Sequence, residues 1–425
     1  MLVAAAVLVV SLVLFSIATA TLWWMMSAWR TPEMLASTTF GQPDGKCGLS
    51  FSLLLPARHE QGVLEHTVHR LLESTHDDYE VIIITGHDDP ETTQIADKLA
   101  ELAPDKIRVV IDTHEIKSKA KALNTALPLC RGDIIGVFDA EDIVHPELLV
   151  HVDYAFRTRQ ADVVQGGVQL INFHSSWYSL RNCLEYFFWF RSRLHLQAEK
   201  GFITLGGNTV FIKTDLLREI GGWDPNCLAE DCELGVRVSS GGGKVVVAYD
   251  PQIVTREETP DSVTSLFKQR TRWNQGFLQV YRKADWKQLP TSRQRGLARF
   301  TLATPFFQSL SGLAVPVGIL IGIFVSVPIW VAMISWLPAV PAFLVLAFEI
   351  AALHDFGREY QLRVKAIHYV KLIIGTPFYQ VVLMGAALRA VWRELTGRND
   401  WELTRHVGAH LVAPAPTSTS PMQTV

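Results

Sequence analysis

Between residues 45 and 298, short apolar runs alternate with segments whose apolar residues recur at helical spacing. Five of the runs have the composition of buried strands, at residues 51–55, 81–84, 107–111, 134–138 and 244–247. Helical spacing over residues 63–72 and 92–102 separates the first three runs. This alternation is typical of an α/β domain, in which helices cover both faces of a parallel sheet and ligands bind beyond the carboxyl ends of the strands.

The N-terminal 30 residues have the pattern of a transmembrane helix. Leu2–Met26 contains no charged residue and is long enough to cross the ~30 Å hydrocarbon layer. A signal peptide is the alternative, but it would have a basic start and a shorter apolar core, and Trp23-Trp24 is more typical of an interfacial anchor. Because Arg30 and Lys46 follow the span and no basic residue precedes it, we expect the N-terminus outside an inner (cytoplasmic) membrane and the next domain in the cytoplasm.

The chain becomes apolar again after the α/β region. Residues 300–352 carry a single charge, Glu349, and prolines near their middle predict two transmembrane helices joined by a tight turn. A further apolar stretch lies within residues 366–411, but spanning there would put four following arginines outside, against the positive-inside rule. We therefore expect an interfacial or re-entrant helix and a cytoplasmic C-terminal segment. Residues 412–425 are rich in Pro, Ser and Thr, which predicts a disordered tail.

Two segments inside the domain, near 177–196 and 263–281, combine helical spacing with aromatic and basic residues. The first carries Arg181, Arg191 and Arg193 and fits an amphipathic helix in the membrane interface. A buried core helix is the competing interpretation. The second segment is expected to lie against the membrane in the same way.

Overall composition excludes some functions. The net charge of −3 gives no sign of a nucleic-acid partner. The five cysteines include no Cys-x-x-Cys pair and no histidine at zinc spacing, so reduced thiols are expected and zinc is not. The 48% hydrophobic content is high for a soluble enzyme and agrees with the apolar termini.

Polar clusters follow three of the predicted strands, at residues 56–60, 87–90 and 139–142. The last cluster, Asp139-Ala140-Glu141-Asp142, places three carboxylates in four residues, and these would repel one another without a positive charge between them. A divalent cation with a nucleotide diphosphate fits, because hard cations prefer oxygen ligands. A solvated acidic turn is the alternative, but three clusters at successive strand ends favour one site. Lys117, Lys119 and Lys121 follow the strand at 107–111; such a run is more often a solvated face, but beside a phosphate-binding edge one of the three could neutralise a pyrophosphate.

Three further groups add candidate chemistry. Gly206-Gly207-Asn208 permits a close approach of backbone to ligand. Glu230-Asp231 begins a predicted helix, where acidic residues are also common for dipole reasons alone. Gln269, Arg272 and Trp273 lie at i, i+3 and i+4, so they share one helix face, and an indole beside a guanidinium suits stacking on a sugar while a phosphate is held.

Taken in chain order, these motifs resemble those of membrane-embedded family 2 glycosyltransferases, the group that holds cellulose, chitin, hyaluronan and poly-N-acetylglucosamine synthases. The resemblance covers residues 50–285 and implies a GT-A (Rossmann-like nucleotide-sugar-binding) domain flanked by transmembrane and interfacial helices. It implies donor contacts from Pro56, Glu60, Asp88, Lys119, Asp139 and Arg272. It implies acceptor contacts from Gly206, Gly207, Asn208, Gln269 and Trp273.

The resemblance also assigns the chemistry. Asp139 and Glu141 match the family's Asp-x-Asp motif, which binds Mg²⁺ or Mn²⁺, and Asp231 matches the general base, with Glu230 beside it. The chain departs from the pattern in places: Glu141 is one methylene longer than the family's Asp, so Asp142 is a rival metal ligand, and Thr85-Gly86-His87 replaces Asp-Asp-Gly, so Asp88 is the substitute for the nucleoside contact. Ala229 replaces a Thr, and Trp401-x-x-Thr404-Arg405 is similar to a segment that follows the last helix in hyaluronan-synthase relatives.

The sequence thus predicts an inverting transfer from a UDP-sugar to a growing polysaccharide at the cytoplasmic membrane face, with export of the product. A single transfer to a polyprenyl phosphate or other lipid acceptor is the alternative. A catalytically inactive nucleotide-binding scaffold is a further one. Glucose, N-acetylglucosamine and alternating donors fit these motifs equally.

Overall fold

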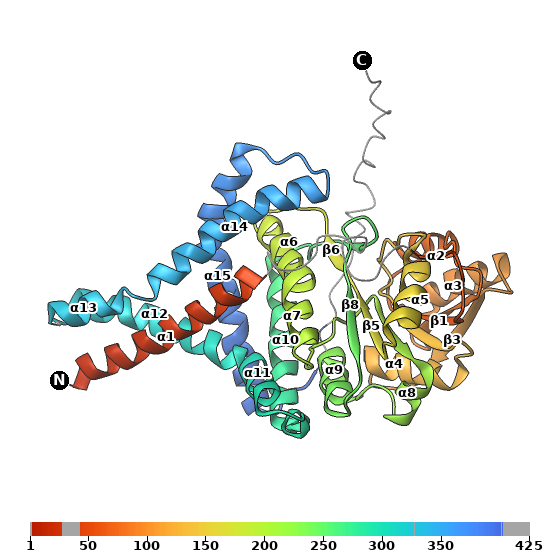
Figure 1. Cartoon of the computed structure of the whole chain (residues 1–425), viewed down its shortest axis with the longest axis horizontal. Coiled ribbons are helices and arrows are strands. Elements are labelled where there is room, and N and C mark those ends of the chain that lie inside the picture. Colours follow the sequence, from red (N-terminus) through yellow and green to blue (C-terminus); the bar gives the residue numbers. More distant parts are fainter. Residues whose placement is uncertain (1, 28–42, 327, 401, 403–425) are drawn as a thin grey trace, which may run out of the picture.

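The computed structural model describes residues 2–27, 43–326, 328–400 and 402. The predictions for Arg30, for Trp401, Thr404 and Arg405, and for the tail at 412–425 fall outside these residues. The described chain forms an α/β domain with an arm of long helices on one side (Figure 1).

The centre of the domain is a seven-stranded sheet in the order β3-β2-β1-β4-β7-β5-β8. Its strands are β1 Phe51–Pro56, β2 Tyr79–Gly86, β3 Ile107–Asp112, β4 Ile134–Val137, β5 Val163–Gly166, β7 Val210–Lys213 and β8 Val245–Ala248. All five predicted strands are present. The pattern missed β5 and β7, and β7 runs antiparallel to both of its neighbours, so the sheet is mixed. A separate ladder pairs β6 Val168–Leu170 with β9 Thr255–Glu257.

Both faces of the sheet are covered, as expected for parallel strands. Along β1, Leu53 and Leu55 point into one hydrophobic cluster and Leu54 points into the other, because side chains alternate with a period of two. The helices of the domain are α2 Leu64–Leu72, α3 Pro90–Leu102, α4 Lys119–Ala126, α5 Leu148–Arg159, α8 Thr214–Glu219, α9 Glu230–Ser240, α10 Val263–Lys283 and α11 Ser292–Leu302. The α/β fold class is therefore confirmed.

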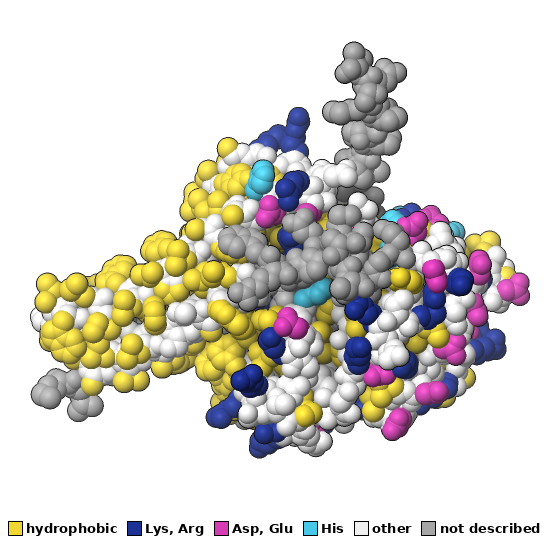
Figure 2. Space-filling view, in the orientation of Figure 1, with side chains coloured by type: hydrophobic (Ala, Val, Ile, Leu, Met, Phe, Trp, Pro, Cys, Tyr) yellow, Lys and Arg dark blue, Asp and Glu magenta, His cyan; other side chains and the backbone are white. Residues whose placement is uncertain are grey.

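The arm consists of α1 Leu2–Met26, α12 Thr304–Phe324, α13 Ile329–Ser335 and α14 Ala339–Glu359. Helix α1 packs against the other three, and large apolar side chains such as Ile323 and Phe343 are 66% and 69% exposed. Figure 2 shows this apolar surface along the arm, while the charged side chains gather on the α/β domain. Within the described residues, four helices have the length and composition to cross a membrane: α1, α12, the stretch from α13 through α14, and α15 Ala366–Leu395.

Helix α15 lies across the base of the arm, beside α10 (Figure 1). Both of its ends contact the α/β domain: the His368 ring lies 5.3 Å from that of Phe173, and Arg393 Nε donates to Gln275 Oε1 over 2.9 Å. A helix that crossed a bilayer would carry one end about 30 Å away from the domain. The interfacial or re-entrant helix expected for this stretch stays a prediction, and the contacts of both helix ends with the domain agree with it.

The aromatic and basic segment forms α6 Ser179–Phe188, a π-helical turn at Trp189–Arg193 and α7 Leu194–Glu199. It lies between the sheet and the long helices, where α6 packs on α14 and α15. Arg181 and Arg191 do not face outward; they are buried and pair with Glu349 and Glu359 of α14. The structure therefore favours the buried core helix over an interfacial helix with a basic outer face.

The ion pair between Arg181 and Glu349 ties the α/β domain to the arm, and its side chains are only 10% and 6% exposed. Glu349→Gln leaves the Arg181 charge buried without its partner, so we expect a loss of about 3–5 kcal/mol in stability. Replacing both, as Arg181→Met with Glu349→Leu, should recover most of it, because no charge is then left buried. Thermal unfolding of the detergent-solubilised chain measures both; equal losses in the single and double variants would contradict this.

Candidate active site

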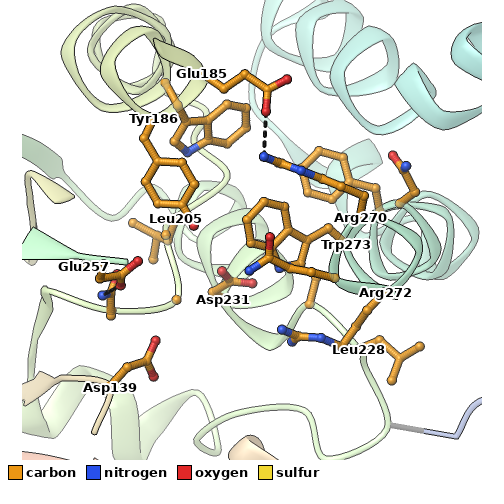
Figure 3. Close-up of a pocket in the computed structure, with 18 of the residues that line it drawn as sticks. Asp139, Glu185, Tyr186, Leu205, Leu228, Asp231, Glu257, Arg270, Arg272 and Trp273 are labelled. Carbon is orange, nitrogen blue, oxygen red and sulfur yellow. Dashed lines mark hydrogen bonds and ion pairs between the residues drawn. The ribbon is translucent and has the colours of Figure 1, made fainter. Parts of the chain in front are cut away.

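A cavity of about 690 Å³ begins at the carboxyl ends of β1, β2 and β4 and continues to the base of the helical arm. Its lining comes from both parts of the chain. Asp139, Glu141, Lys119, Glu230 and Asp231 line the domain end, and Ile17, Trp24, Phe307 and Leu383 line the other. Figure 3 shows Asp231 between Asp139 on one side and the Trp273 ring on the other.

The acidic loop after β4 separates its three carboxylates. Asp139 and Glu141 line the cavity, whereas Asp142 does not. Asp142 is fully buried and accepts hydrogen bonds from Asp139 N at 2.8 Å and Asn208 Nδ2 at 3.1 Å. Burial and the nearby Glu257 carboxylate raise its pKa well above the usual range. Asp142 therefore closes the turn and is poorly placed as the rival metal ligand.

Asn208 serves the same turn. Although it lines the cavity, its amide is already used, since Nδ2 donates to Asp142 and to Glu257. A sugar hydroxyl could therefore reach only the Oδ1 of this side chain, because Nδ2 is held by two carboxylates. The geometry therefore fits a positioning role better than an acceptor contact.

Lys119 lies at the start of α4, where the Ser118 hydroxyl caps the helix by accepting from Lys121 N. Its Nζ donates to Asp139 and, over 2.7 Å, to the Gly207 carbonyl. Burial alone would lower the pKa of Lys119, but Asp139 and Glu230 outweigh it and hold the pKa above its usual value. The ammonium thus joins the two acidic groups of the cavity.

Glu230 and Asp231 occupy the first turn of α9, where the helix dipole favours negative charge. Burial, followed by the neighbouring Asp231 charge, raises the pKa of Glu230 to about 7. Burial also raises the pKa of Asp231, against a 2.7 Å hydrogen bond from Cys232 N that lowers it. Two adjacent carboxylates with separate environments can divide the tasks of holding and accepting a proton.

Gly207 lies beside both Asp231 and Lys119. A Cβ at this position would lie 3.2 Å from Asp231 Oδ2 and 3.8 Å from Lys119 Nζ, so any side chain there would fill the space around the Asp231 carboxylate. We expect Gly207→Ala to lower turnover about 10²-fold, because small misplacements at a reacting centre have effects of that size. Steady-state rates with a nucleotide sugar measure this, and unchanged thermal unfolding would show that the fold survives. A wild-type rate would mean that this space is not used.

The predicted shared face of α10 also lines the cavity, through Gln269, Arg272 and Trp273. Gln269 is 9% exposed, and its Oε1 has no hydrogen-bond partner among the described residues. The Trp273 ring lies 6.3 Å from that of Tyr186, and the Arg270 guanidinium covers it at 4.5 Å. Two aromatic rings and an unsatisfied buried amide at one end of a cavity suit a sugar or another polyol.

At the end of the cavity where we expect the nucleoside, the lining differs from the prediction at one residue. Pro56 and Glu60 line the cavity as expected, but Asp88 does not. It pairs with Arg58 at 2.6 Å and is 37% exposed. Asp112, at the end of β3, and Lys117 line the cavity instead. The contact expected from Asp88 stays a prediction, since its partners Arg58 and Lys117 line the cavity while Asp88 itself does not.

Several residues of the cavity were not singled out from the sequence: Tyr186, Glu257, Glu258 and Arg270. Arg270 pairs with Glu185 at 2.5 Å (Figure 3). Glu257 ends β9, a three-residue strand without periodicity of its own. The aromatic segment was the one signal available for Tyr186, and it was assigned to the membrane surface.

A divalent cation such as Mg²⁺ needs several oxygen ligands around one point. No group of three or more His, Cys, Asp or Glu side chains within the described residues could hold a metal ion. The chain can offer Asp139 and Glu141, which both reach the cavity. A hexacoordinate Mg²⁺ or Mn²⁺ would fit if diphosphate oxygens and water completed its ligands.

Comparisons with known proteins agree with this arrangement. The profile described as "Glycosyltransferase like family 2" matches residues 49–276. The beta-monoglucosyldiacylglycerol synthase of Trichormus variabilis is 30% identical over 237 residues, 54% of this chain and 49% of that protein. The poly-beta-1,6-N-acetyl-D-glucosamine synthase of Staphylococcus aureus MSSA476 is 24% identical over 259 residues, 58% of each chain. This chain thus spans about half the length of these curated relatives.

Among solved structures, the mannosyltransferase PcManGT from Pyrobaculum calidifontis, in complex with GDP-Man and Mn²⁺, shares the fold. The TM-score is 0.62 at 16% identity, over 92% of this chain and 99% of that one. Because the family profile covers more than half of the sequence, including the acidic loop, α9 and most of α10, the chain is a member of glycosyltransferase family 2, with a GT-A fold.

Proposed function

We propose that this protein transfers a sugar from a UDP-sugar to an acceptor at the cytoplasmic face of the inner membrane. One observation carries the proposal: the Asp139–Glu141 loop and the Glu230–Asp231 pair face the same cavity, with Lys119 between them. Such a cavity offers a place for a charged donor and, beside it, a group that can accept a proton. The resemblance of the motifs and the names of the relatives support a nucleotide sugar as donor.

Pro56, Glu60 and Asp112 are proposed to hold the nucleoside, and Lys119 and Arg272 the diphosphate. Asp139 and Glu141 would hold Mg²⁺ or Mn²⁺. Such an ion, when bound, supplies positive charge to the leaving diphosphate. Lys119 already lies against Asp139, so donor binding would draw its ammonium towards phosphate oxygen.

In the proposed step, the acceptor hydroxyl oxygen attacks the anomeric carbon from the face opposite the leaving group. Asp231 takes the hydroxyl proton as the new C–O bond forms. The bond from the anomeric carbon to the diphosphate oxygen breaks, and UDP leaves with the electron pair. The products are UDP and an acceptor glycoside of inverted configuration, and the proton on Asp231 passes to solvent.

The membrane end of the cavity favours a lipid acceptor. Its lining includes Phe307 of α12 and Leu383 and Met384 of α15, which suit an apolar chain. Among the described residues, α12 presents mostly exposed apolar side chains. Single transfer to a lipid is therefore our first choice, with α1, α12 and α13–α14 as the spans and α15 in the interface.

A growing polysaccharide is the second candidate. The Tyr186 and Trp273 rings and the unsatisfied Gln269 amide would equally suit the end of a glycan, and this is the product that the motif order predicts.

Product analysis tests the proposal. The purified chain in phosphatidylcholine vesicles is incubated with Mn²⁺ and a panel of radiolabelled UDP-sugars, with and without lipid acceptors. Label in discrete organic-soluble glycolipids would support a lipid acceptor; label in a hydrolase-sensitive polymer would support the polysaccharide. Tight UDP binding without any transfer would contradict both and favour the scaffold.

A further inference from the structure

One cation in the membrane end of the cavity has no anionic partner. Arg193, the last residue of the π-helical turn, lines the cavity. Its guanidinium lies 4.1 Å from the centre of the Trp24 ring and 5.1 Å from that of Trp189. Its Nε is buried without a hydrogen-bond partner, and no carboxylate among the described residues forms an ion pair with it.

The neighbouring arginines, unlike Arg193, each form an ion pair with a carboxylate. Arg181 pairs with Glu349, Arg191 with Glu359 and Arg270 with Glu185. Two indole rings stabilise a guanidinium less than a carboxylate does once water is excluded. Burial lowers the pKa of Arg193 to about 9, although the side chain keeps some exposure to the cavity. An anion bound in the cavity would supply the missing partner.

The position of Arg193 gives the depth of that anion. Trp24 lies two residues before the end of α1, where tryptophans of membrane helices mark the lipid headgroup level. Ser192 Oγ hydrogen-bonds the Trp24 carbonyl at 3.2 Å and lies 3.1 Å from Ser27 Oγ, so the turn is fastened to this end of α1. Phosphate is the anion that lipids carry at that level.

Polar side chains mark a path beside it. Thr304, Gln308 and Ser311 lie on one face of α12 and line the cavity. The Gln308 amide is half-buried and makes no hydrogen bond with a described residue. Polar groups that face the inside of transmembrane helices usually mark a substrate path.

From these observations we infer that Arg193 binds the phosphate of a phosphate-containing lipid acceptor, in which the phosphate joins the apolar chain to the hydroxyl-bearing group that receives the sugar. This inference rests on the proposed lipid acceptor and names its chemical class. The phosphate itself does not react: its hydroxyl-bearing group extends past the Tyr186 and Trp273 rings to Asp231, and the transfer written above leaves the phosphate unchanged. A phosphatidyl polyol and a polyprenyl diphosphate sugar both have this chemistry.

Binding measured without donor tests the inference in the full chain. The probes are two matched pairs in phosphatidylcholine nanodiscs: phosphatidylinositol against a neutral glucosyl diacylglycerol, and undecaprenyl diphosphate N-acetylglucosamine against neutral undecaprenyl glucoside. We expect one phosphate lipid to bind at least about tenfold more tightly than its neutral partner, and to become the glycosylated product. The pair that shows the preference identifies the source of the phosphate.

Arg193→Gln is the diagnostic variant, and Arg293→Gln, an exposed arginine of α11 outside the cavity, is its matched control. Arg193→Gln should remove the preference for phosphate, raise KM for the phosphate lipid at least about tenfold and leave UDP binding unchanged. The control should keep the preference.

Three results would overturn the inference. Equal binding of charged and neutral lipids by the wild type would show that the protein does not recognise the phosphate. Equal weakening of both by Arg193→Gln would show a structural role. The phosphate lipid could also bind without receiving sugar while a neutral lipid is glycosylated. Arg193 would then bind only a headgroup of the bilayer and not the acceptor. Polymer as the sole product would instead contradict the proposed lipid acceptor itself. Failure of the phosphate inference can therefore be distinguished from failure of the proposed function.

Discussion

Asp231→Asn is expected to lower the rate of sugar transfer by about 10²–10⁴-fold, the range in which a positioned general base contributes. Asparagine keeps the shape of the side chain and can still accept the hydrogen bond from Cys232 N, but it cannot take up the acceptor proton. Donor binding should change little, because the proposed donor contacts are other residues. The measurement is steady-state transfer together with calorimetric binding of UDP and Mn²⁺.

The matched control is Glu219→Gln, which removes one carboxylate from the exposed end of α8 and should leave the rate unchanged. In the wild type, activity should fall as the pH is lowered, since Asp231 must be ionised to act and burial raises its pKa. Near-wild-type transfer by Asp231→Asn would show that Asp231 is not the base. Glu230→Gln would then be the next variant to assay.

The second large effect separates the two residues that compete for the metal. Glu141→Gln should raise the Mn²⁺ concentration for half-maximal activity by at least about a hundredfold, since loss of a residue that only supports a ligand already costs 10–100-fold. Asp142→Asn should have a much smaller effect on this concentration, because Asp142 is buried and does not line the cavity. Activity measured across a Mn²⁺ titration gives both values.

The reverse ranking, with Asp142→Asn causing the larger shift, would mean that the loop rearranges when donor binds. A Glu141→Gln variant with a normal Mn²⁺ requirement but a lower stability would assign Glu141 a structural role. Thermal unfolding without metal separates loss of the ion from loss of the fold.

Local patterns were enough for much of the domain. The strand runs at 51–55 and 134–138 and the helical spacing from Val63 to Leu72 reappear as β1, β4 and α2, because a buried parallel strand needs a continuous apolar run and an amphipathic helix needs a 3.6-residue period. The same logic placed the polar clusters together, since the carboxyl ends of parallel strands meet at one edge of a sheet. The motif order then led to glycosyltransferase family 2, and the family profile confirmed it.

Other features depended on contacts between distant parts of the chain. Only the hydrogen bond from Asn208 to Asp142, 66 residues apart in sequence, shows which acidic side chains of the loop remain open to the cavity. Strand β7 carries no sign of its direction, because pairing partners and not side-chain period determine whether a strand runs antiparallel. The aromatic and basic composition of its segment placed Arg181 at a membrane surface, whereas its partner Glu349 lies in another part of the sequence.

The amino-acid sequence by itself therefore determined the fold class, the family and the loops that carry the candidate chemistry, since these follow from local periodicity and motif order. Tertiary structure decided which side chains of those loops face the cavity, and it joined that cavity to the helical arm. It also left Arg193 without an anionic partner among the described residues. This environment results from the packing of α1 against the π-helical turn. A charge becomes costly only when the fold removes its water, so no pattern along the chain could have revealed it.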